Sequence, residues 1–214
     1  MKIIEPSVEL LTPFEGAEVL KFIESCGRVC YRSTTQTFEG LTEKFIRNLI
    51  KRGHESVLEH FSCTFKILCD RGVMAELTRH RLASFSIEST RYCDYASDKF
   101  GGELTFIKLC FGRDDFQQFL HGTMWFESAI KKIENYYKCM RKENIPPEQA
   151  RAILPNSLAT TIVMTANLRE WRHILKLRTD SKAHPQMRHV AGMILDIFKS
   201  KIPVVFEDIE NGRI

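Results

Sequence analysis

The chain has 214 residues, of which 43% are hydrophobic and 27% charged, and its formal net charge is +4 at pH 7. Such values are ordinary for a globular protein, and we expect residues 1–214 to form a single domain. They argue against a surface that is basic throughout, which nucleic-acid-binding domains usually have. The sequence has no run of about 18 apolar residues and no signal-peptide pattern, so we expect a cytoplasmic protein (host cytosol, if viral) without membrane contact.

Several common cofactor-binding and catalytic motifs are absent from the sequence. There is no GxGxxG motif or P-loop to hold a phosphate on glycine backbone, and no GxSxG motif. The seven cysteines are odd in number and include no CxxC pair, which favours free thiols over disulfides or a zinc site. Any cofactor would therefore have to be bound by Arg, His and Ser side chains.

The first half of the chain contains two segments with helical spacing and one with strand spacing. Residues 16–33 and 41–53 place apolar residues every three or four positions, and Thr42 is a candidate cap for the second of these helices. Residues 61–68 alternate between apolar and polar side chains, as a half-buried strand does. Residues 72–78 are expected to form a short helix.

The second half of the chain mixes strands and helices in no regular alternation. Strands are expected at residues 103–109 and 159–168. Helices are expected at residues 114–144, opened by Asp114 and Asp115, and at residues 147–154, 169–178 and 184–200. The irregular order predicts an α+β fold, in which helices pack on a mostly antiparallel sheet.

A basic triplet, Arg79–His80–Arg81, ends the helix at 72–78 and precedes a hydroxyl-rich segment that we expect to be a loop. Three successive residues cannot share one face of a helix, but at a helix end they can point toward different anionic groups. Arginine suits phosphate because its planar guanidinium donates two parallel hydrogen bonds. The residues that follow include Ser84, Ser86, Ser89, Thr90 and Arg91. The segment indicates a site for phosphate or pyrimidine oxygens, with a solvated basic corner as the alternative.

The segment GHESVLEH concentrates histidine and glutamate just before the first predicted strand. His54, Glu55, Glu59 and His60 could ligate a metal, although the spacing is not that of an HExxH motif. The alternatives are a capping turn and the polar wall of a cofactor pocket. The sequence leaves these three interpretations open.

The segment after the strand at 159–168 is rich in polar and basic residues, namely Asn167, Arg169, Arg172, His173, Lys176 and Arg178. It fits either a ligand-binding face or an ordinary exposed face of a helix whose buried stripe is Trp171, Ile174 and Leu175. Arg178 could also cap carbonyl groups at the end of the helix. Arg151 is isolated in an apolar stretch, where an arginine usually extends to solvent.

Together these segments resemble the flavin-dependent thymidylate synthases. That family's signature is Arg-His-Arg, seven residues and Ser, which matches Arg79, His80, Arg81 and Ser89. The stretches RVCYRS, GHES…EH, ARAILPNSL and TANLREWRHILKLRTDSKAHPQMR also resemble the family's blocks, in the same order. The resemblance covers roughly residues 19 to 200.

The resemblance implies an α+β protein that assembles as a homotetramer with active sites shared between subunits. It implies that the protein binds FAD, takes electrons from NADPH and uses 5,10-methylenetetrahydrofolate to convert dUMP to dTMP, with hydride supplied by the reduced flavin. A cysteine nucleophile is not required, which agrees with the lack of a catalytic-cysteine signature.

The resemblance also implies roles for individual residues. Those implied to bind dUMP are Glu76, Arg79, Ile87, Ser89, Thr90, Arg91, Arg151 and Arg178. Those implied to bind FAD are His54, Ser56, Arg79, His80, Arg81, Asn167, Arg169 and His173. Arg178 would be catalytic and lie on the pyrimidine, favouring its N3-ionised form, because a fixed cation stabilises negative charge in a dry site. Arg79 would reach both ligands from a neighbouring subunit, and no metal is implied.

Four positions depart from the residues that are commoner in the family. Glu76 stands where many members have Gln, so its carboxylate must pair with an arginine or be protonated. Ile87 replaces a polar residue, which leaves only its backbone to bind. His173 stands where some relatives have Asn, and Ser56 replaces a frequent Thr while keeping the hydroxyl.

An RNA- or DNA-binding module with an Arg-rich loop is the alternative function. Such a module would place aromatic side chains among the basic ones for base stacking, and only Phe85 and Tyr92 lie near the triplet. Salt-sensitive oligonucleotide binding by a colourless protein would favour this alternative, whereas a yellow protein would favour the flavoenzyme. We expect the flavoenzyme, with no nucleic-acid partner.

Overall fold

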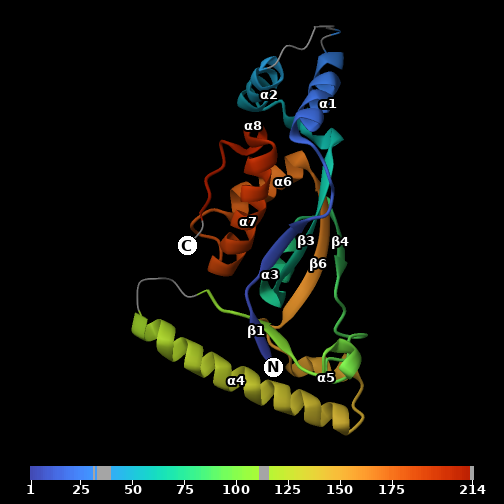
Figure 1. The fold of residues 1–214 in the computed structure, drawn as a ribbon, viewed down its shortest axis with the longest axis vertical. Coiled ribbons are helices and arrows are strands. Elements are labelled where there is room, and N and C mark those ends of the chain that lie inside the picture. The colour runs from blue at the N-terminus through green and yellow to red at the C-terminus, as the bar shows by residue number, and fades with distance from the viewer. Residues whose placement is uncertain (31, 33–39, 111–115, 213–214) are drawn as a thin grey trace.

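The computed structural model describes residues 1–30, 32, 40–110 and 116–212, without the side chains of residues 116–119. Its centre is a four-stranded antiparallel sheet in the order β2-β3-β6-β4 (Figure 1). These strands are β2 (Ser7–Leu10), β3 (Ser62–Asp70), β4 (Ala83–Ile87) and β6 (Ala159–Asn167). The predicted α+β class with a mostly antiparallel sheet is confirmed. None of the described helices is long and apolar enough to cross a membrane.

The two central strands pair along nine residues, from Ser62 opposite Asn167 to Asp70 opposite Ala159. Because side chains alternate across a strand, Phe65 and its partner Met164 point into the core and are fully buried. Thr64 and Thr165 point to the opposite face, where their hydroxyls lie 2.8 Å apart. One face of the sheet is therefore apolar and the other is lined by hydroxyl groups.

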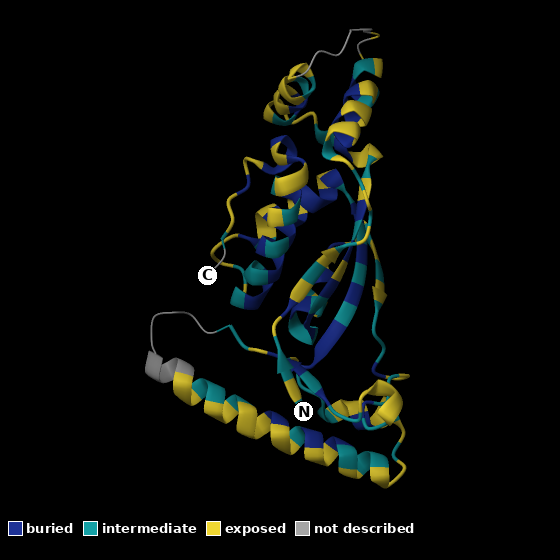
Figure 2. Ribbon diagram, in the orientation of Figure 1, coloured by how far each residue is buried: buried dark blue, intermediate teal, exposed yellow. Residues whose placement is uncertain are grey.

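Helices α3 (Arg71–Leu77), α6 (Leu168–Arg178), α7 (Pro185–Lys201) and α8 (Pro203–Phe206) lie on the apolar side (Figure 1). The predicted inward stripe of α6 is buried, and so is the apolar face of α7, which includes Met187, Val190, Ile194 and Phe198 (Figure 2). Trp171 and Phe198 pack edge-on against Phe65 at centroid distances of 5.1 and 5.2 Å. Such aromatic contacts each stabilise a core by about 1 kcal/mol beyond the burial of area, so they fix α6 and α7 against the centre of the sheet.

Helices α1 (Gly16–Val29) and α2 (Leu41–Lys51) pack together at one end of the molecule, followed by the short 3₁₀ helix η1 (Glu55–His60) (Figure 1). The first helix ends at Val29, short of the predicted residue 33. The prediction that Thr42 caps α2 is wrong: the cap position is Gly40, in a left-handed conformation, and no side chain bonds there. The Thr42 hydroxyl instead donates to Glu24 Oε2 at 2.5 Å, because this buried carboxylate of α1 needs a donor.

A second, smaller core lies at the other end of the sheet. Here β1 (Lys2–Ile4) pairs in parallel with β5 (Thr105–Ile107), next to the long helix α4 (Phe116–Lys142) and the short helices η2 (Asp98–Phe100), α5 (Pro147–Ala150) and η3 (Arg151–Ile153) (Figures 1 and 2). Its buried side chains include Phe106, Ile130 and Tyr137. The predicted opening of α4 by Asp114 and Asp115 lies outside the described residues.

Strand β4 corrects the prediction that a loop follows the basic triplet. Residues 83–87 pair with β6, with Ala83 opposite Ala166 and Ile87 opposite Ile162. Phe85 and Ile87 pack against the main core, while Ser84 and Ser86 are exposed. The segment is a strand because its apolar residues alternate with serines, a pattern of period two. Only after the strand, at residues 88–93, does the chain form an irregular turn.

Candidate active site

Arg178, the last residue of α6, is held by three contacts to residues about 100 positions earlier in the chain. Its Nη1 lies 2.7 Å from Glu76 Oε2, its Nη2 donates to the Glu76 carbonyl oxygen at 3.1 Å, and its Nε donates to His80 Nε2 at 3.0 Å. The side chains of Arg178 and Glu76 remain 21% and 32% exposed. The guanidinium is therefore fixed in position with part of its surface open to a ligand.

His80 is buried behind this arginine and is uncharged at neutral pH. Its Nε2 accepts a hydrogen bond from Arg178, so the proton of the neutral ring lies on Nδ1, 3.7 Å from Glu170 Oε1. Burial, followed by the charges of Arg178 and His173, lowers the pKa of His80 to about 4. We call Glu76, His80, Glu170 and Arg178 the Arg178 cluster.

A cavity of about 710 Å³ adjoins the Arg178 cluster through Glu170, and we call it the α6 cavity. Its size is within the range of small-molecule pockets. Its lining comes from η1, the residue before β4, the end of β6 and α6, and comprises Glu55, Glu59, Leu82, Asn167, Arg169, Glu170, Arg172, His173 and Lys176. Three of the predicted FAD-binding residues, Asn167, Arg169 and His173, are among them. The predicted face of α6 thus lines a cavity.

The charged side chains of the α6 cavity differ in how free they are to bind a ligand. Arg172 is 1% exposed and pairs with Asp208 at 2.7 Å and Glu55 at 3.2 Å, so it holds the structure together. Arg169 is 51% exposed and pairs with Glu59 at the surface. Exposed pairs of this kind contribute little stability and exchange partners easily. Arg169 is therefore available to an anionic ligand, and Arg172 is not.

Asn167 and the segment before β3 complete the surroundings of this cavity. Asn167 caps α6 by accepting the Glu170 amide at 2.9 Å, and its side-chain nitrogen has no hydrogen-bond partner among the described residues. Of the three interpretations of GHESVLEH, the structure favours a pocket wall, because Glu55 and Glu59 line the cavity. The described part of the chain contains no cluster of three metal-ligating side chains. His54 and Ser56 are exposed and lie outside the lining.

The basic triplet separates its side chains as a helix end allows. His80 turns inward, while Arg79 and Arg81 are exposed. Within the part of the chain that the structure describes, neither guanidinium forms a hydrogen bond or an ion pair. Two unpaired arginines therefore flank the Arg178 cluster.

The Ser89 turn, residues 88–93, follows β4 at the opposite end of the sheet. The Ser89 carbonyl accepts the amides of Tyr92 and Cys93 at 3.2 and 3.0 Å, and its hydroxyl accepts the amide of Arg91 at 3.3 Å. Arg151 Nη1 donates to Thr90 Oγ1 at 3.2 Å. Two arginines and two hydroxyls are thus gathered at one turn, as a phosphate site requires.

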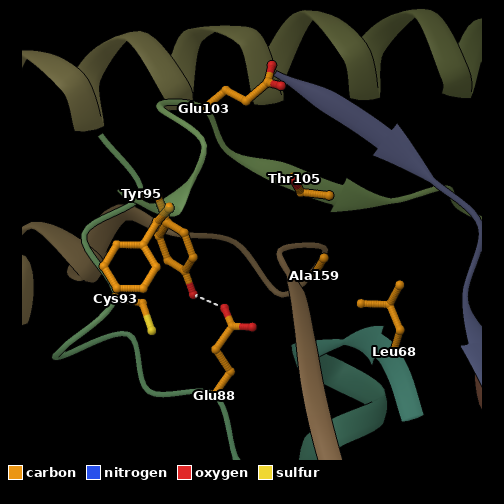
Figure 3. Close-up of a pocket in the computed structure, with 8 residues that line it drawn as sticks. Leu68, Glu88, Cys93, Tyr95, Glu103, Thr105 and Ala159 are labelled. Atoms are coloured by element: carbon orange, nitrogen blue, oxygen red, sulfur yellow. Dashed lines mark hydrogen bonds between the residues drawn. The ribbon is translucent and has the colours of Figure 1, made fainter. Parts of the chain in front are cut away.

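A second cavity, of about 420 Å³, lies beside the Ser89 turn (Figure 3). Leu68 and Ala159 at the end of the sheet line it, with Tyr95 and Phe100 from the segment after the turn. The Tyr95 hydroxyl donates to Glu88 Oε1 at 2.7 Å. Glu88 and Cys93 of the Ser89 turn line this cavity, and Cys93 donates its amide to the Ser89 carbonyl, but none of the predicted site residues is part of the lining.

The predicted residues therefore form two groups within one chain. The Arg178 cluster and the α6 cavity depend on α3 and α6, whereas the Ser89 turn and Arg151 lie near α5 (Figure 1). Among the described residues, no hydrogen bond or ion pair joins the groups. Ile87, the last residue of β4, packs its side chain against the main core, so only its backbone can face a ligand.

Comparison with known proteins identifies the family. The model described as "Thymidylate synthase complementing protein" matches residues 13–204. A probable flavin-dependent thymidylate synthase of Mycobacterium phage L5 is 34% identical over 205 residues, covering 92% of this chain and 82% of the phage protein. The flavin-dependent thymidylate synthase of Geobacter sulfurreducens is 32% identical over 198 residues, covering 86% and 79%.

The chain belongs to the flavin-dependent thymidylate synthase family. The predicted enzyme class, the flavin cofactor and the conversion of dUMP to dTMP are thereby confirmed, and the nucleic-acid-binding alternative is not supported. A crystal structure of the UMP/dUMP methylase PolB from Streptomyces cacaoi, bound with 5-Br dUMP, has the same fold. Its TM-score is 0.79 at 24% identity, and the match covers 97% of this chain and 96% of that one.

The α6 cavity fits the family's flavin. The unpartnered amide nitrogen of Asn167, the exposed guanidinium of Arg169 and the imidazole of His173 are donors suited to phosphate and ring oxygens. Sequence reasoning did not single out Glu170 or Leu82, which share this cavity. For Glu170 the one available signal is its position three residues before His173, which puts both on one face of a helix.

Proposed function

We propose that the Arg178 cluster, the α6 cavity and the Ser89 turn are the parts of one site that converts dUMP to dTMP. The co-substrates are 5,10-methylenetetrahydrofolate as carbon donor and NADPH as reductant. The observation that carries the proposal is the anchoring of Arg178 by Glu76 and His80 beside a cavity lined by the predicted FAD-binding residues. A guanidinium fixed in this way pays no reorganisation energy when negative charge develops on a bound pyrimidine.

FAD is held in the α6 cavity by Asn167, Arg169 and His173, with His54, Ser56, Arg79 and Arg81 reaching it from outside the described lining. When bound, the flavin supplies the hydride that completes the methyl group. His80 acts behind Arg178: as a neutral acceptor it orients the guanidinium without adding a second positive charge. The surrounding arginines favour anionic ligands although the chain as a whole is only weakly basic.

The Ser89 turn and Arg151 hold the phosphate of dUMP, and Arg178 contacts its pyrimidine. Arg91 is 52% exposed and only loosely paired with Glu148 at 3.8 Å, so it can exchange that partner for a phosphate. Ser89 and Thr90 add hydroxyl donors, and backbone amides at Ile87 and beyond can complete the contacts. Arg79 spans from the nucleotide to the flavin.

The active site is completed between subunits of a homotetramer. Within one chain the predicted site residues lie in two separate groups, so a second subunit is needed to bring both kinds of residue together. This arrangement has a direct test by complementation. Arg178→Ala and Arg151→Ala each remove one group, and neither protein alone should form dTMP. When the two variant proteins are mixed and their subunits exchange, some sites should contain both arginines, and dTMP formation should return. A mixture as inactive as its components, under proven exchange, contradicts shared sites.

The visible spectrum of the purified protein tests the flavin, and Arg178→Ala tests the chemistry. We expect a yellow protein that NADPH bleaches in the presence of dUMP. Arg178→Ala should fold and bind FAD as wild type does but should not form dTMP. Arg47→Ala is the control: it breaks an exposed ion pair with Glu207 and should leave folding, FAD binding and dTMP formation unchanged. Turnover of the Arg178 variant within about tenfold of wild type would reject its role, since tenfold corresponds to about 1.4 kcal/mol of barrier.

A further inference from the structure

We propose that Glu170 is a positioning residue for Arg178 and acts through His80. Its carboxylate holds the proton of His80 on Nδ1, so that Nε2 remains free to accept from the Arg178 guanidinium. The inference rests on the proposed binding of the dUMP pyrimidine at Arg178. It adds to the site a residue to which the family resemblance gave no role.

Glu170, His80 and Arg178 stand in a row behind the open surface of the guanidinium. Arg178 Nε donates to His80 Nε2 at 3.0 Å, and Glu170 Oε1 lies 3.7 Å from Nδ1, on the other side of the ring. Helix α6 supplies both ends of the row, because Glu170 is in its first turn and Arg178 is its last residue. Eight residues of helix separate these ends by about 12 Å. His80, which follows α3, bridges this distance.

The two neighbours of His80 select the same form of its ring. A neutral imidazole has one donor and one acceptor nitrogen, and either nitrogen can carry the proton. Arg178 is a donor only and requires an acceptor at Nε2, while a carboxylate is an acceptor only and favours the proton at Nδ1. At 3.7 Å the carboxylate is beyond hydrogen-bond distance, so it acts mainly through its charge on the N–H group. Water screens this attraction little, because the side chains of His80 and Glu170 are only 5% and 10% exposed.

The charges around His80 keep the ring neutral. A carboxylate by itself would favour a second proton on the ring. Burial opposes this, as do the charges of Arg178 and His173, and together they hold the pKa of His80 at about 4. Glu170 can therefore fix the tautomer and orientation of the ring without creating a second positive charge beside Arg178.

The alternative role for Glu170 is to support the start of α6. It is the third residue of that helix, whose cap is Asn167, and an acidic residue in a first turn stabilises a helix. Within the described residues, however, the ion pair of its carboxylate is with His80, and the carboxylate forms no hydrogen bond to the helix start. Glu170 also lines the α6 cavity, so a molecule bound there shields the contact with His80 from water. These contacts favour a role directed at His80.

A double-mutant cycle of Glu170→Leu and His80→Leu tests whether Glu170 acts through the ring. We expect Glu170→Leu to weaken dUMP binding to the FAD-loaded enzyme by at least about fivefold, because a buried N–H without an acceptor no longer holds the ring in place. In the His80→Leu background the same change should alter dUMP affinity by less than about twofold. Isothermal titration calorimetry without folate or NADPH measures these affinities independently of turnover.

Two further variants separate this role from a structural one. Glu18→Leu makes the same substitution at an acidic residue in the first turn of α1, and should leave dUMP affinity unchanged. If Glu170→Leu does not fold, Glu170→Gln carries the same cycle, because it removes the charge with little change of shape. It should weaken dUMP binding by at least about twofold, and only where His80 is present.

Equal losses of dUMP affinity with and without the His80 ring, or no loss in either background, overturn the inference and leave the proposed function intact. Failure of the proposed function looks different. In that case Arg178→Ala would bind dUMP as tightly as wild type, which would show that the pyrimidine does not reach Arg178.

Discussion

Replacing His80 by Gln should make the stability of the fold less sensitive to acid. A histidine ordinarily has a pKa of about 6.5, and burial beside Arg178 lowers that of His80 to about 4. Between these values the unfolded chain binds a proton that the folded chain does not. The free energy of unfolding therefore rises with pH through this window. Above about pH 7 His80 is neutral in both states, and its protonation no longer favours the unfolded chain. Gln at position 80 can still accept from Arg178 but does not titrate.

The size of the effect follows from the two pKa values. Lowering the pH from about 7 to about 5 protonates His80 almost completely in the unfolded chain and hardly at all in the folded one. The wild-type free energy of unfolding should consequently fall by about 2 kcal/mol more than that of His80→Gln. Burial of the ring, at 6% exposure, keeps solvent from screening this difference.

Urea unfolding followed by circular dichroism at several pH values, at one fixed protein concentration, measures the difference. His60→Gln is the control, because it makes the same substitution at an exposed histidine. If the unfolding free energies of wild type and His80→Gln fall in parallel between about pH 7 and 5, His80 is not held neutral in the fold and the reasoning is refuted.

Two further predictions concern the supports of the site. Arg172→Met removes the buried guanidinium that bonds Glu55 and Asp208 and should lower the free energy of unfolding by about 2 kcal/mol, as measured by chemical denaturation; a loss below about 0.5 kcal/mol would show that the guanidinium is dispensable. Gly16→Ala would place its Cβ 1.9 Å from the Lys201 carbonyl oxygen, and should lower stability by about 2 kcal/mol or more, whereas Glu18→Ala on the same helix should be nearly neutral.

The regular elements of this fold were predictable where one face of a segment is buried. The inward stripe of α6 and the alternation in β3 gave the positions of these two elements within a residue or two, because burial enforces periodicity. Strand β4 has the same alternation, yet its serines and the preceding arginines suggested a loop. Strands β1 and β2 are too short, at three and four residues, to carry a period that sequence reasoning can detect.

The partners of the site residues could not be predicted, because they come from distant parts of the chain. Glu76 and Arg178 are 102 positions apart, and Arg172 and Glu55 are 117 apart. The sequence showed both arginines on a polar helix face, where they looked alike. Only the three-dimensional structure separates Arg172, buried against two carboxylates, from Arg178, which is anchored but open to a ligand.

The order of the strands has a consequence for how the chain folds during synthesis. Strand β6 lies in the centre of the sheet but is made last, after β2, β3 and β4. Until it emerges, β3 and β4 have no common partner, and their edges stay open to pairing with other chains. Nascent chains should therefore need protection from aggregation for most of translation, and the sheet should close late, through contacts of long sequence separation.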